Sequence, residues 1–248
     1  MINREVLLVN PNRMRPPIAP LGLDYLAEAL AYRGYGPVLC DLCGAEDWQQ
    51  TLDAAIEAVR PGAIAFTVRN LDDAYFASRD FIFETTAAMV RHAMARSPVP
   101  VILGGVGFSI APCEALRYAG APYGVWGDGE HALPDLLDCL AAGGEVSRVP
   151  GAVYWADGVV RAVPPRPFDP ADGPARARRF LENATYFAEG GQGGIETKRG
   201  CVYSCVYCVE PHAKGKHIRL IPPESVADEI AAMLDQGVDV FHFCDSEF

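Results

Sequence analysis

Short apolar runs alternate with helical patterns along the first part of the chain. Runs typical of buried strands occur at residues 6–9, 37–42, 63–68, 99–103 and 123–126. Between them, apolar positions recur at helical spacing, which predicts helices over residues 21–33, 48–59, 73–96, 113–118 and 130–141. This alternation predicts a mainly parallel sheet with right-handed crossovers and helices on both faces. We therefore expect residues 1–145 to form a doubly wound α/β domain of the Rossmann or flavodoxin type.

The segments that follow these strands are rich in glycine, proline and polar residues. Ligands of such sheets bind outside the carboxyl ends of the strands, so these segments form the predicted ligand site. Its candidate residues are Asn10, Pro20, Leu21, Arg69, Asn70, Gly104, Gly105, Gly107, Gly127, Gly129 and Glu130. Glycines let a backbone approach a ligand closely, and helix starts offer free N–H groups. No loop carries the G-x-G-x-x-G fingerprint, so turn glycines without a ligand remain the alternative.

The second half of the chain changes character. Residues 149–155 and 159–163 flank Asp157-Gly158 and predict a β-hairpin, and residues 164–174 are rich in proline. We assign residues 146–190 to a linker region, with a short helix over residues 176–181.

The last part of the chain has the pattern of the first units of a (β/α) barrel. A strand at 195–198, a helix at 225–236 and a strand at 238–244 give the order in which such a barrel begins, and we assign residues 191–248 to it. An apolar run such as 240–243 should be paired on both sides. We therefore expect the chain to be a fragment: a truncated form, one product of a split gene, or the opening of a longer protein.

Three cysteines stand close together at the start of this last part. Cys201, Cys205 and Cys208 have the spacing C-x3-C-x2-C. Thiolates are the usual ligands of iron–sulfur clusters, and three of them would leave one iron of a [4Fe–4S] cluster open. Zinc is the alternative, although structural zinc sites usually add a second Cys or His pair. His212 or His217 could supply the missing ligand.

Tyr207 precedes the last cysteine, and the motif then resembles the C-x3-C-x-aromatic-C signature of the radical S-adenosylmethionine (SAM) superfamily. The resemblance implies that SAM chelates the open iron and is cleaved reductively to a 5′-deoxyadenosyl radical. It also implies an electron donor such as flavodoxin or ferredoxin. It places Tyr207 against the SAM adenine. Asp245 and Glu247, which stand where the family has a Gly-Gly-Glu motif, would bind the methionine part of SAM.

Three further segments, Pro20-Leu21-Gly22-Leu23, Gly104-Gly105 and Gly127-Asp128-Gly129-Glu130, resemble the cobalamin-binding branch of that superfamily. The resemblance implies that the candidate residues at the strand ends bind cobalamin. The D-x-H-x-x-G motif, whose histidine coordinates cobalt, does not occur. We expect Arg69 to lie beneath the cobalt instead. A guanidinium cannot coordinate a metal, so the lower face of the cobalt would have no protein ligand. An ion pair between Arg69 and Asp72 or Asp73 is the alternative.

The resemblance implies a cobalamin-dependent radical SAM enzyme. The expected reaction is methyl transfer from SAM, through cobalamin, to an unactivated carbon of a small-molecule or peptide substrate. A rearranging or cyclising enzyme of the same branch, and a catalytically incomplete fragment that binds cobalamin or an iron–sulfur cluster, are the alternatives.

The amino-acid composition argues against some classes of binding partner and indicates the cellular compartment. A net charge of −11 and a pI near 4.9 argue against nucleic acid or an anionic membrane as a partner. No apolar stretch approaches the roughly 20 residues of a membrane span, and the N-terminus lacks the regions of a signal peptide. We expect a cytoplasmic protein with reduced thiols, in which Cys40, Cys43, Cys113, Cys139 and Cys244 act as small apolar residues. Arg176, Arg178 and Arg179 are expected to be solvated.

Overall fold

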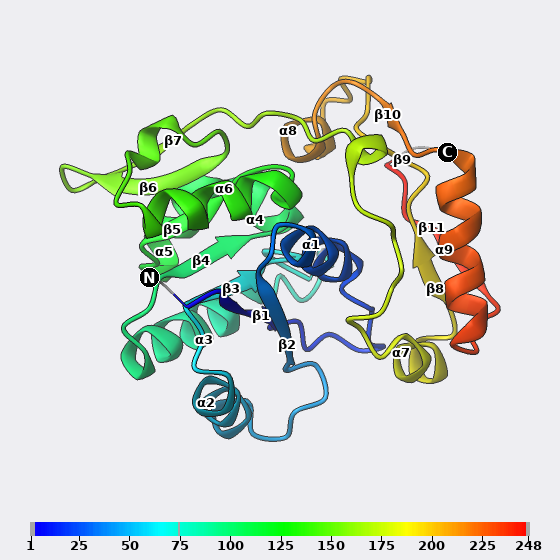
Figure 1. Cartoon of the computed structure of the whole chain (residues 1–248), viewed down its shortest axis with the longest axis horizontal. Helices are drawn as coiled ribbons and strands as arrows, with labels where there is room; N and C mark the ends of the chain where they lie inside the picture. The colour runs from blue at the N-terminus through cyan, green and yellow to red at the C-terminus, as the bar shows by residue number, and fades with distance from the viewer. Residues whose placement is uncertain (1–2, 74, 247–248) are drawn as a thin grey trace.

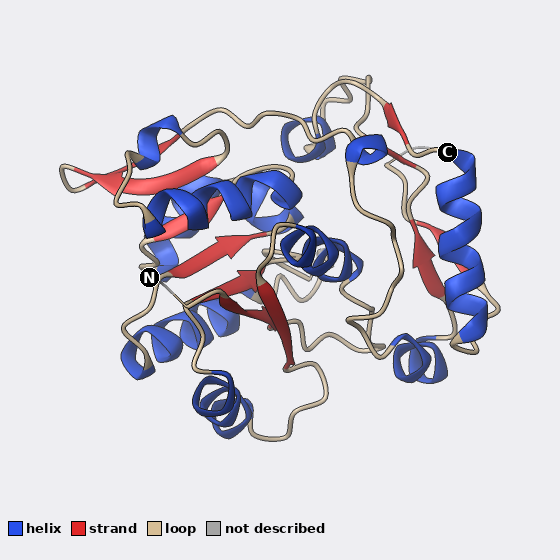
Figure 2. Ribbon diagram, in the orientation of Figure 1, coloured by secondary structure: helices blue, strands red, loops and turns tan. Residues whose placement is uncertain are grey.

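The computed structural model describes residues 3–73 and 75–246. Its main feature is a seven-stranded sheet in the order β2-β1-β3-β4-β5-β6-β7 (Figures 1 and 2). The strands are β1 (Glu5–Asn10), β2 (Gly36–Asp41), β3 (Ala63–Thr67), β4 (Val101–Gly104), β5 (Tyr123–Val125), β6 (Ala152–Ala156) and β7 (Val159–Ala162). The strands from β2 to β5 in this order pair in parallel, whereas β6 and β7 form an antiparallel hairpin on β5. The order 2-1-3-4-5 is flavodoxin-like, which confirms the predicted fold class.

Helices cover both faces of this sheet because its central strands are apolar on both sides. In β1, Val6 and Leu8 pack with α1 (Leu21–Tyr32) and α6 (Gly129–Ala141). Leu7 and Val9 face the opposite way, toward the core that the helices of the other face form. Those helices are α2 (Trp48–Val59), α3 (Phe83–Arg96) and α5 (Pro112–Ala119), and the short α4 (Val106–Ile110) follows β4 directly.

The helix predicted over residues 73–96 begins only at Phe83, so its first turns were predicted wrongly. The Asp73 carboxylate accepts hydrogen bonds from the backbone N–H of Tyr75 at 3.1 Å and from the hydroxyl of Ser78. Local bonds of this kind give the backbone an alternative to the helix. Residues 68–73 and 75–82 therefore form loops and turns.

The C-terminal module, of which the structure describes residues 191–246, contains one β/α/β unit beside the main sheet. Strands β8 (Gly193–Ile195) and β11 (Phe241–Phe243) pair in parallel, and α9 (Pro223–Asp235) lies on their outer side (Figure 1). Ile195, Met233 and Val238 form its small core. The strand–helix–strand order is the one predicted for this part of the chain, although β8 begins inside the glycine run and ends earlier than predicted.

Shorter elements connect these parts. They are the 3-10 turns η1 (Val146–Arg148) and η2 (Pro170–Asp172), the helices α7 (Asn183–Gly190) and α8 (Glu210–Lys214), and the antiparallel pair β9 (Lys198–Arg199) and β10 (Arg219–Leu220). The helix predicted at 176–181 is absent from the described chain. Arg178 has a φ of 52°, which a right-handed helix does not allow, and the helix forms further on as α7. None of the helices in the described residues has the length and apolarity of a membrane span.

Candidate functional site: two cavities that share a wall

A cavity of about 710 Å³ lies between the carboxyl ends of the main-sheet strands and the C-terminal module. All the predicted cobalamin-binding residues except Gly107 line it, namely Asn10, Pro20, Leu21, Arg69, Asn70, Gly104, Gly105, Gly127, Gly129 and Glu130. Glu196, Arg199 and Cys244 line it from the C-terminal module. The topology thus brings segments that are distant in sequence to one side of the sheet.

Glycine shapes one wall of this cavity. Gly105 has a φ of +97°, and a Cβ there would lie 2.7 Å from the carbonyl oxygen of Val68. Gly107 donates its N–H to the same carbonyl at 2.9 Å and packs against the backbone of Arg69. The ends of β3 and β4 therefore approach more closely than side chains would allow, which leaves a backbone cradle.

Arg69 is the cation that the β3 end contributes to the cavity. Burial lowers the pKa of its guanidinium.

The side chain of Asn10 lines the cavity but is engaged within the protein. Its Nδ2 donates to Asp41 at 2.9 Å and to the hydroxyl of Tyr186 at 3.0 Å, and its Oδ1 accepts from the N–H of Asn12 at 3.2 Å. Asn10 therefore joins the ends of β1 and β2 to α7, and forms part of the cavity wall.

The cysteine loop lies next to this cavity. The side chains of Cys205 and Cys208 line a second cavity of about 520 Å³, together with Trp126, Pro165 and His212. The two cavities share the wall residues Gly127, Asp128, Ala213 and Lys214. Cys201 is only 8% exposed, and its N–H donates to the carbonyl of Gly215 at 3.1 Å.

The donor set of this loop fits an iron–sulfur cluster, because three thiolates in one short segment are soft ligands of the required kind. Within residues 3–73 and 75–246, no three His, Cys, Asp or Glu side chains are grouped as they would be around a bound metal ion. Cys205 is exposed and Cys208 half-buried, so both thiols are accessible from the second cavity. His212 lines the same cavity with its ring 4.9 Å from that of Trp126, and remains a possible zinc ligand.

The predicted SAM-binding residues have different environments. Tyr207 is 86% exposed. Asp245 follows β11, and its carboxylate accepts hydrogen bonds from the N–H groups of Thr197 and Lys198 at 2.8 and 3.1 Å, and from the Thr197 hydroxyl at 2.5 Å. Asp245 thus ties the end of β11 to the turn after β8. Glu247 lies outside the described residues.

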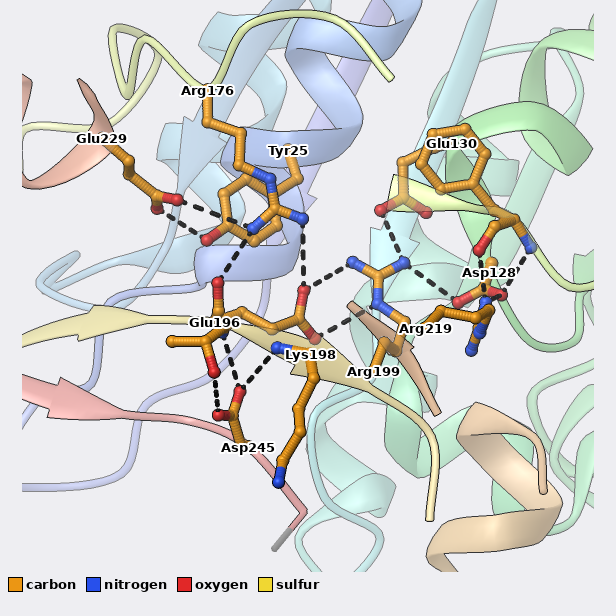
Figure 3. A network of polar contacts seen from close by, with 12 residues as sticks. Tyr25, Asp128, Glu130, Arg176, Glu196, Lys198, Arg199, Arg219, Glu229 and Asp245 are labelled. Carbon is orange, nitrogen blue, oxygen red and sulfur yellow. Dashed lines mark hydrogen bonds and ion pairs between the residues drawn. The ribbon is translucent and has the colours of Figure 1, made fainter. Parts of the chain in front are cut away.

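Sequence reasoning missed a buried ionic network between the two modules (Figure 3). Arg199 lies 3.0 Å from Asp128, 2.8 Å from Glu130 and 2.8 Å from Glu196. Arg219 pairs with Asp128 from the other side. Burial by itself would lower the pKa of Arg199, but Glu130, Glu196 and Asp128 outweigh it and raise this pKa well above its ordinary value.

The network continues through the arginines that were predicted to be solvated. Arg178 is 1% exposed and pairs with Asp24 and Glu229 at 2.9 Å each. Arg176 pairs with Glu229 at 3.5 Å and lies over the ring of Tyr25 at 4.1 Å. The prediction of solvated side chains is therefore wrong for these two arginines. Arg179 is the exposed member of the trio, although it pairs with Glu28.

Comparisons with known proteins relate the chain to proteins that bind cobalamin. Residues 13–137, half of the chain, match the B12 binding domain family. The tryptophan 2-C-methyltransferase of Streptomyces laurentii is 34% identical over 98% of this chain and 49% of its own length. The radical SAM methyltransferase TsrM of Kitasatospora setae, solved with cobalamin and a [4Fe–4S] cluster bound, superimposes with a TM-score of 0.90. It is 32% identical over 99% of this chain and 48% of its own length.

The chain belongs to the B12 binding domain family, within the cobalamin-binding branch of the radical SAM enzymes. It spans about half the length of the curated relatives that it matches.

Proposed function

We propose that this chain binds cobalamin in the 710 Å³ cavity and a [4Fe–4S] cluster through Cys201, Cys205 and Cys208, as part of a methyltransferase. The observation that carries the proposal is the wall shared by the glycine-lined cavity and the cysteine cavity. When bound, cobalamin carries a methyl group between SAM and substrate, and the cluster supplies an open iron that holds SAM. Such a transfer requires neighbouring cofactors, and the shared wall of the two cavities supports this arrangement.

The chain's own residues would orient the cofactor and exclude water. The cradle at Gly105 lets backbone N–H and C=O groups reach a flat macrocycle, while Pro20 and Leu21 supply an apolar wall. Arg69 stays protonated and cannot coordinate a metal, so it would leave the lower face of the cobalt without a protein ligand. Weak ligation on that face favours transfer of the methyl group.

The substrate of the reaction is proposed to be a carbon centre of a small molecule or peptide. Tryptophan is the first compound to test, because the 34% identical relative is named for methylation of tryptophan at C2. Tyr207 would lie against the SAM adenine once SAM occupies the open iron. A flavodoxin or ferredoxin is the proposed electron donor.

The proposal is tested by anaerobic reconstitution with iron, sulfide and hydroxocobalamin. We expect about four iron atoms per chain, as for one [4Fe–4S] cluster, together with retained cobalamin. Cys201→Ala, Cys205→Ala and Cys208→Ala should each lower the iron content, whereas Cys113→Ala, outside the motif, should not. One zinc per chain with no retained cobalamin would overturn the proposal.

Turnover is tested separately on the reconstituted chain. Tryptophan and SAM labelled in its methyl group are supplied with a chemical reductant, and the products are analysed by mass spectrometry. Label on the indole carbon supports methyl transfer to carbon. Consumption of SAM without a labelled product contradicts tryptophan as the substrate.

A further inference from the structure

Asp128 is one of the residues shared by the walls of the two cavities, and it pairs with Arg199, which lines the larger one. Asp128 belongs to the β5–α6 turn and lines both cavities. Its carboxylate accepts hydrogen bonds from Arg199 at 3.0 Å, from the N–H of Phe168 at 2.9 Å, and from Arg219. Arg199 also bonds Glu196 through both Nε and Nη2, at 3.1 and 2.8 Å. One guanidinium thus joins the turn beside the cobalamin cavity to the strand that leads into the cysteine loop (Figure 3).

Only one residue separates Arg199 from the first cysteine, and that residue is held tightly. Gly200 has a φ of +95°, and a Cβ there would lie 2.2 Å from the carbonyl oxygen of His217. Cys201 is then fixed by its N–H bond to Gly215. A displacement of Arg199 must therefore displace Cys201, whereas Cys205 lies on the exposed part of the loop.

Position 199 requires an arginine, because the contacts there depend on both the charge and the planar shape of the guanidinium. The three carboxylates of Asp128, Glu130 and Glu196 converge on Arg199 from different elements. A planar guanidinium can satisfy all three at once because its donors are spread over a rigid fork. A lysine ammonium would keep the charge, but it is a compact group. It cannot bond the three carboxylates in the directions that the guanidinium reaches.

We propose that Arg199 is a positioning residue that fixes Cys201, and with it the cluster, at a set distance from the cobalamin cavity. The inference rests on the proposed function, which supplies the two cofactors. Its first consequence can nevertheless be measured in the cofactor-free protein. Without the fork of Arg199, the segment that carries Cys201 should move relative to the β5–α6 turn.

The test compares Arg199→Lys with Arg178→Lys in the full chain. Arg178 is the matched control, because it is also buried and also joins carboxylates from two elements. Its side-chain hydrogen-bond partners within the described residues are Asp24, Gly194, Glu229 and Asn183, all outside residues 201–208. In the cofactor-free protein, the rate of alkylation of Cys201 is measured by peptide mass spectrometry, with Cys40 as an internal reference. We expect this rate to rise several-fold in Arg199→Lys and to stay at the wild-type value in Arg178→Lys. A general loss of stability would affect Cys201 and Cys40 in both variants.

The second measurement uses the reconstituted protein. Cobalt(II) in cobalamin and a reduced cluster each carry an unpaired electron, so cluster reduction speeds the spin relaxation of cobalt according to their separation. We expect Arg199→Lys to retain both cofactors but to lose or broaden this enhancement, and methyl transfer to fall by about 100-fold, as for a 1 Å misplacement. Arg178→Lys should keep the enhancement.

Wild-type alkylation and relaxation in Arg199→Lys would overturn the inference. A wild-type chain that binds neither cofactor would refute the proposed function instead, and the alkylation of Cys201 would still decide whether Arg199 positions it. Should Arg199→Lys fail to fold by circular dichroism, Glu196→Gln, which removes one partner and keeps the shape, is judged by the same criteria.

Discussion

The guanidinium of Arg178 lies 2.9 Å from the carboxylate of Asp24, although 154 residues separate them in the sequence. Arg178 also donates to Glu229, to the carbonyl of Gly194 and to Asn183. This one side chain joins α1 of the main domain to α9 and β8 of the C-terminal module. Buried charges therefore hold the two modules together.

Replacing Arg178 by Met should destabilise the protein strongly. The change leaves Asp24 and Glu229 buried with less compensation, and breaking a buried ion pair costs about 3–5 kcal/mol. Urea denaturation at neutral pH measures the loss. Arg148→Met is the control, since its partner Glu145 is solvated and Arg148 itself is 79% exposed, so a change below about 1 kcal/mol is expected. Similar losses in both variants would contradict a structural part for the buried network.

Replacing Tyr25 by Phe should also lower stability, but by less. The Tyr25 hydroxyl donates to Glu229 at 2.6 Å, and burial followed by the charge of Glu229 raises the pKa of this phenol well above its ordinary value. Removing the donor leaves a buried carboxylate with one partner fewer, which costs about 1–3 kcal/mol. Tyr32→Phe, at a position 76% exposed, should leave the urea midpoint unchanged. An unchanged midpoint for Tyr25→Phe would show that the bond contributes nothing net.

The central strands of the main sheet could be predicted because each of them is a compact apolar run buried on both faces. Runs such as Val6 to Val9 bury residues on both sides of the sheet, and local pattern alone carries that information. The same rule locates the ligand end of the sheet, because parallel strands all finish at one edge. The residues that line the 710 Å³ cavity follow from this topology.

The ionic network could not be predicted from local pattern. Arg178 lies in a proline-rich linker region with four other basic or small residues around it, which is typical of a solvated segment. Its burial depends on acidic side chains of α1 and α9, and their alignment exists only in the folded chain. Asp24 and Glu229 are the one sequence signal of a buried ionic network. Each is a charged residue within a helix that is otherwise largely apolar on its packed face.

The thiol of Cys40 should stay protonated and unreactive in the native protein. Burial, and after it the charge of Asp41, raises the pKa of Cys40 to about 11. Since an ordinary thiol titrates near pH 8.5, the unfolded chain loses this proton first. The contribution of Cys40 to stability is thus complete below about pH 8.5 and is lost as the pH rises toward 11.

Alkylation of the native chain at pH 8 tests this expectation. Cys40 should react only as fast as the protein unfolds, whereas the exposed Cys205 should react at once. The free energy of unfolding should also decrease between pH 9 and 11, more in wild type than in Cys40→Ala. Rapid native-state labelling of Cys40 would contradict its burial, and with it the reading of Cys40 as a small core residue.

Substituting Gly105 by Ala should damage the proposed cobalamin site beyond the cost of backbone strain. Gly105 and Gly120 both have positive φ, at +97° and +75°. An L residue costs about 1–2 kcal/mol in the left-handed helical region of Gly120, whereas the backbone of Gly105, with ψ of 170°, is in a region that is essentially restricted to glycine. A Cβ at Gly120 meets nothing within 4 Å, whereas one at Gly105 would lie 2.7 Å from the carbonyl of Val68. Gly120→Ala should therefore lose only stability and keep its affinity for hydroxocobalamin.

Gly105→Ala must separate the ends of β3 and β4, which alters the cradle beside Arg69. We expect it to weaken hydroxocobalamin binding at least tenfold relative to Gly120→Ala, a difference of about 1.4 kcal/mol in binding free energy. Equilibrium dialysis at a temperature where both variants are folded gives the two affinities. If both variants bind hydroxocobalamin as wild type does, the cofactor does not use the wall that Gly105 forms, and the cavity at the strand ends is not its site.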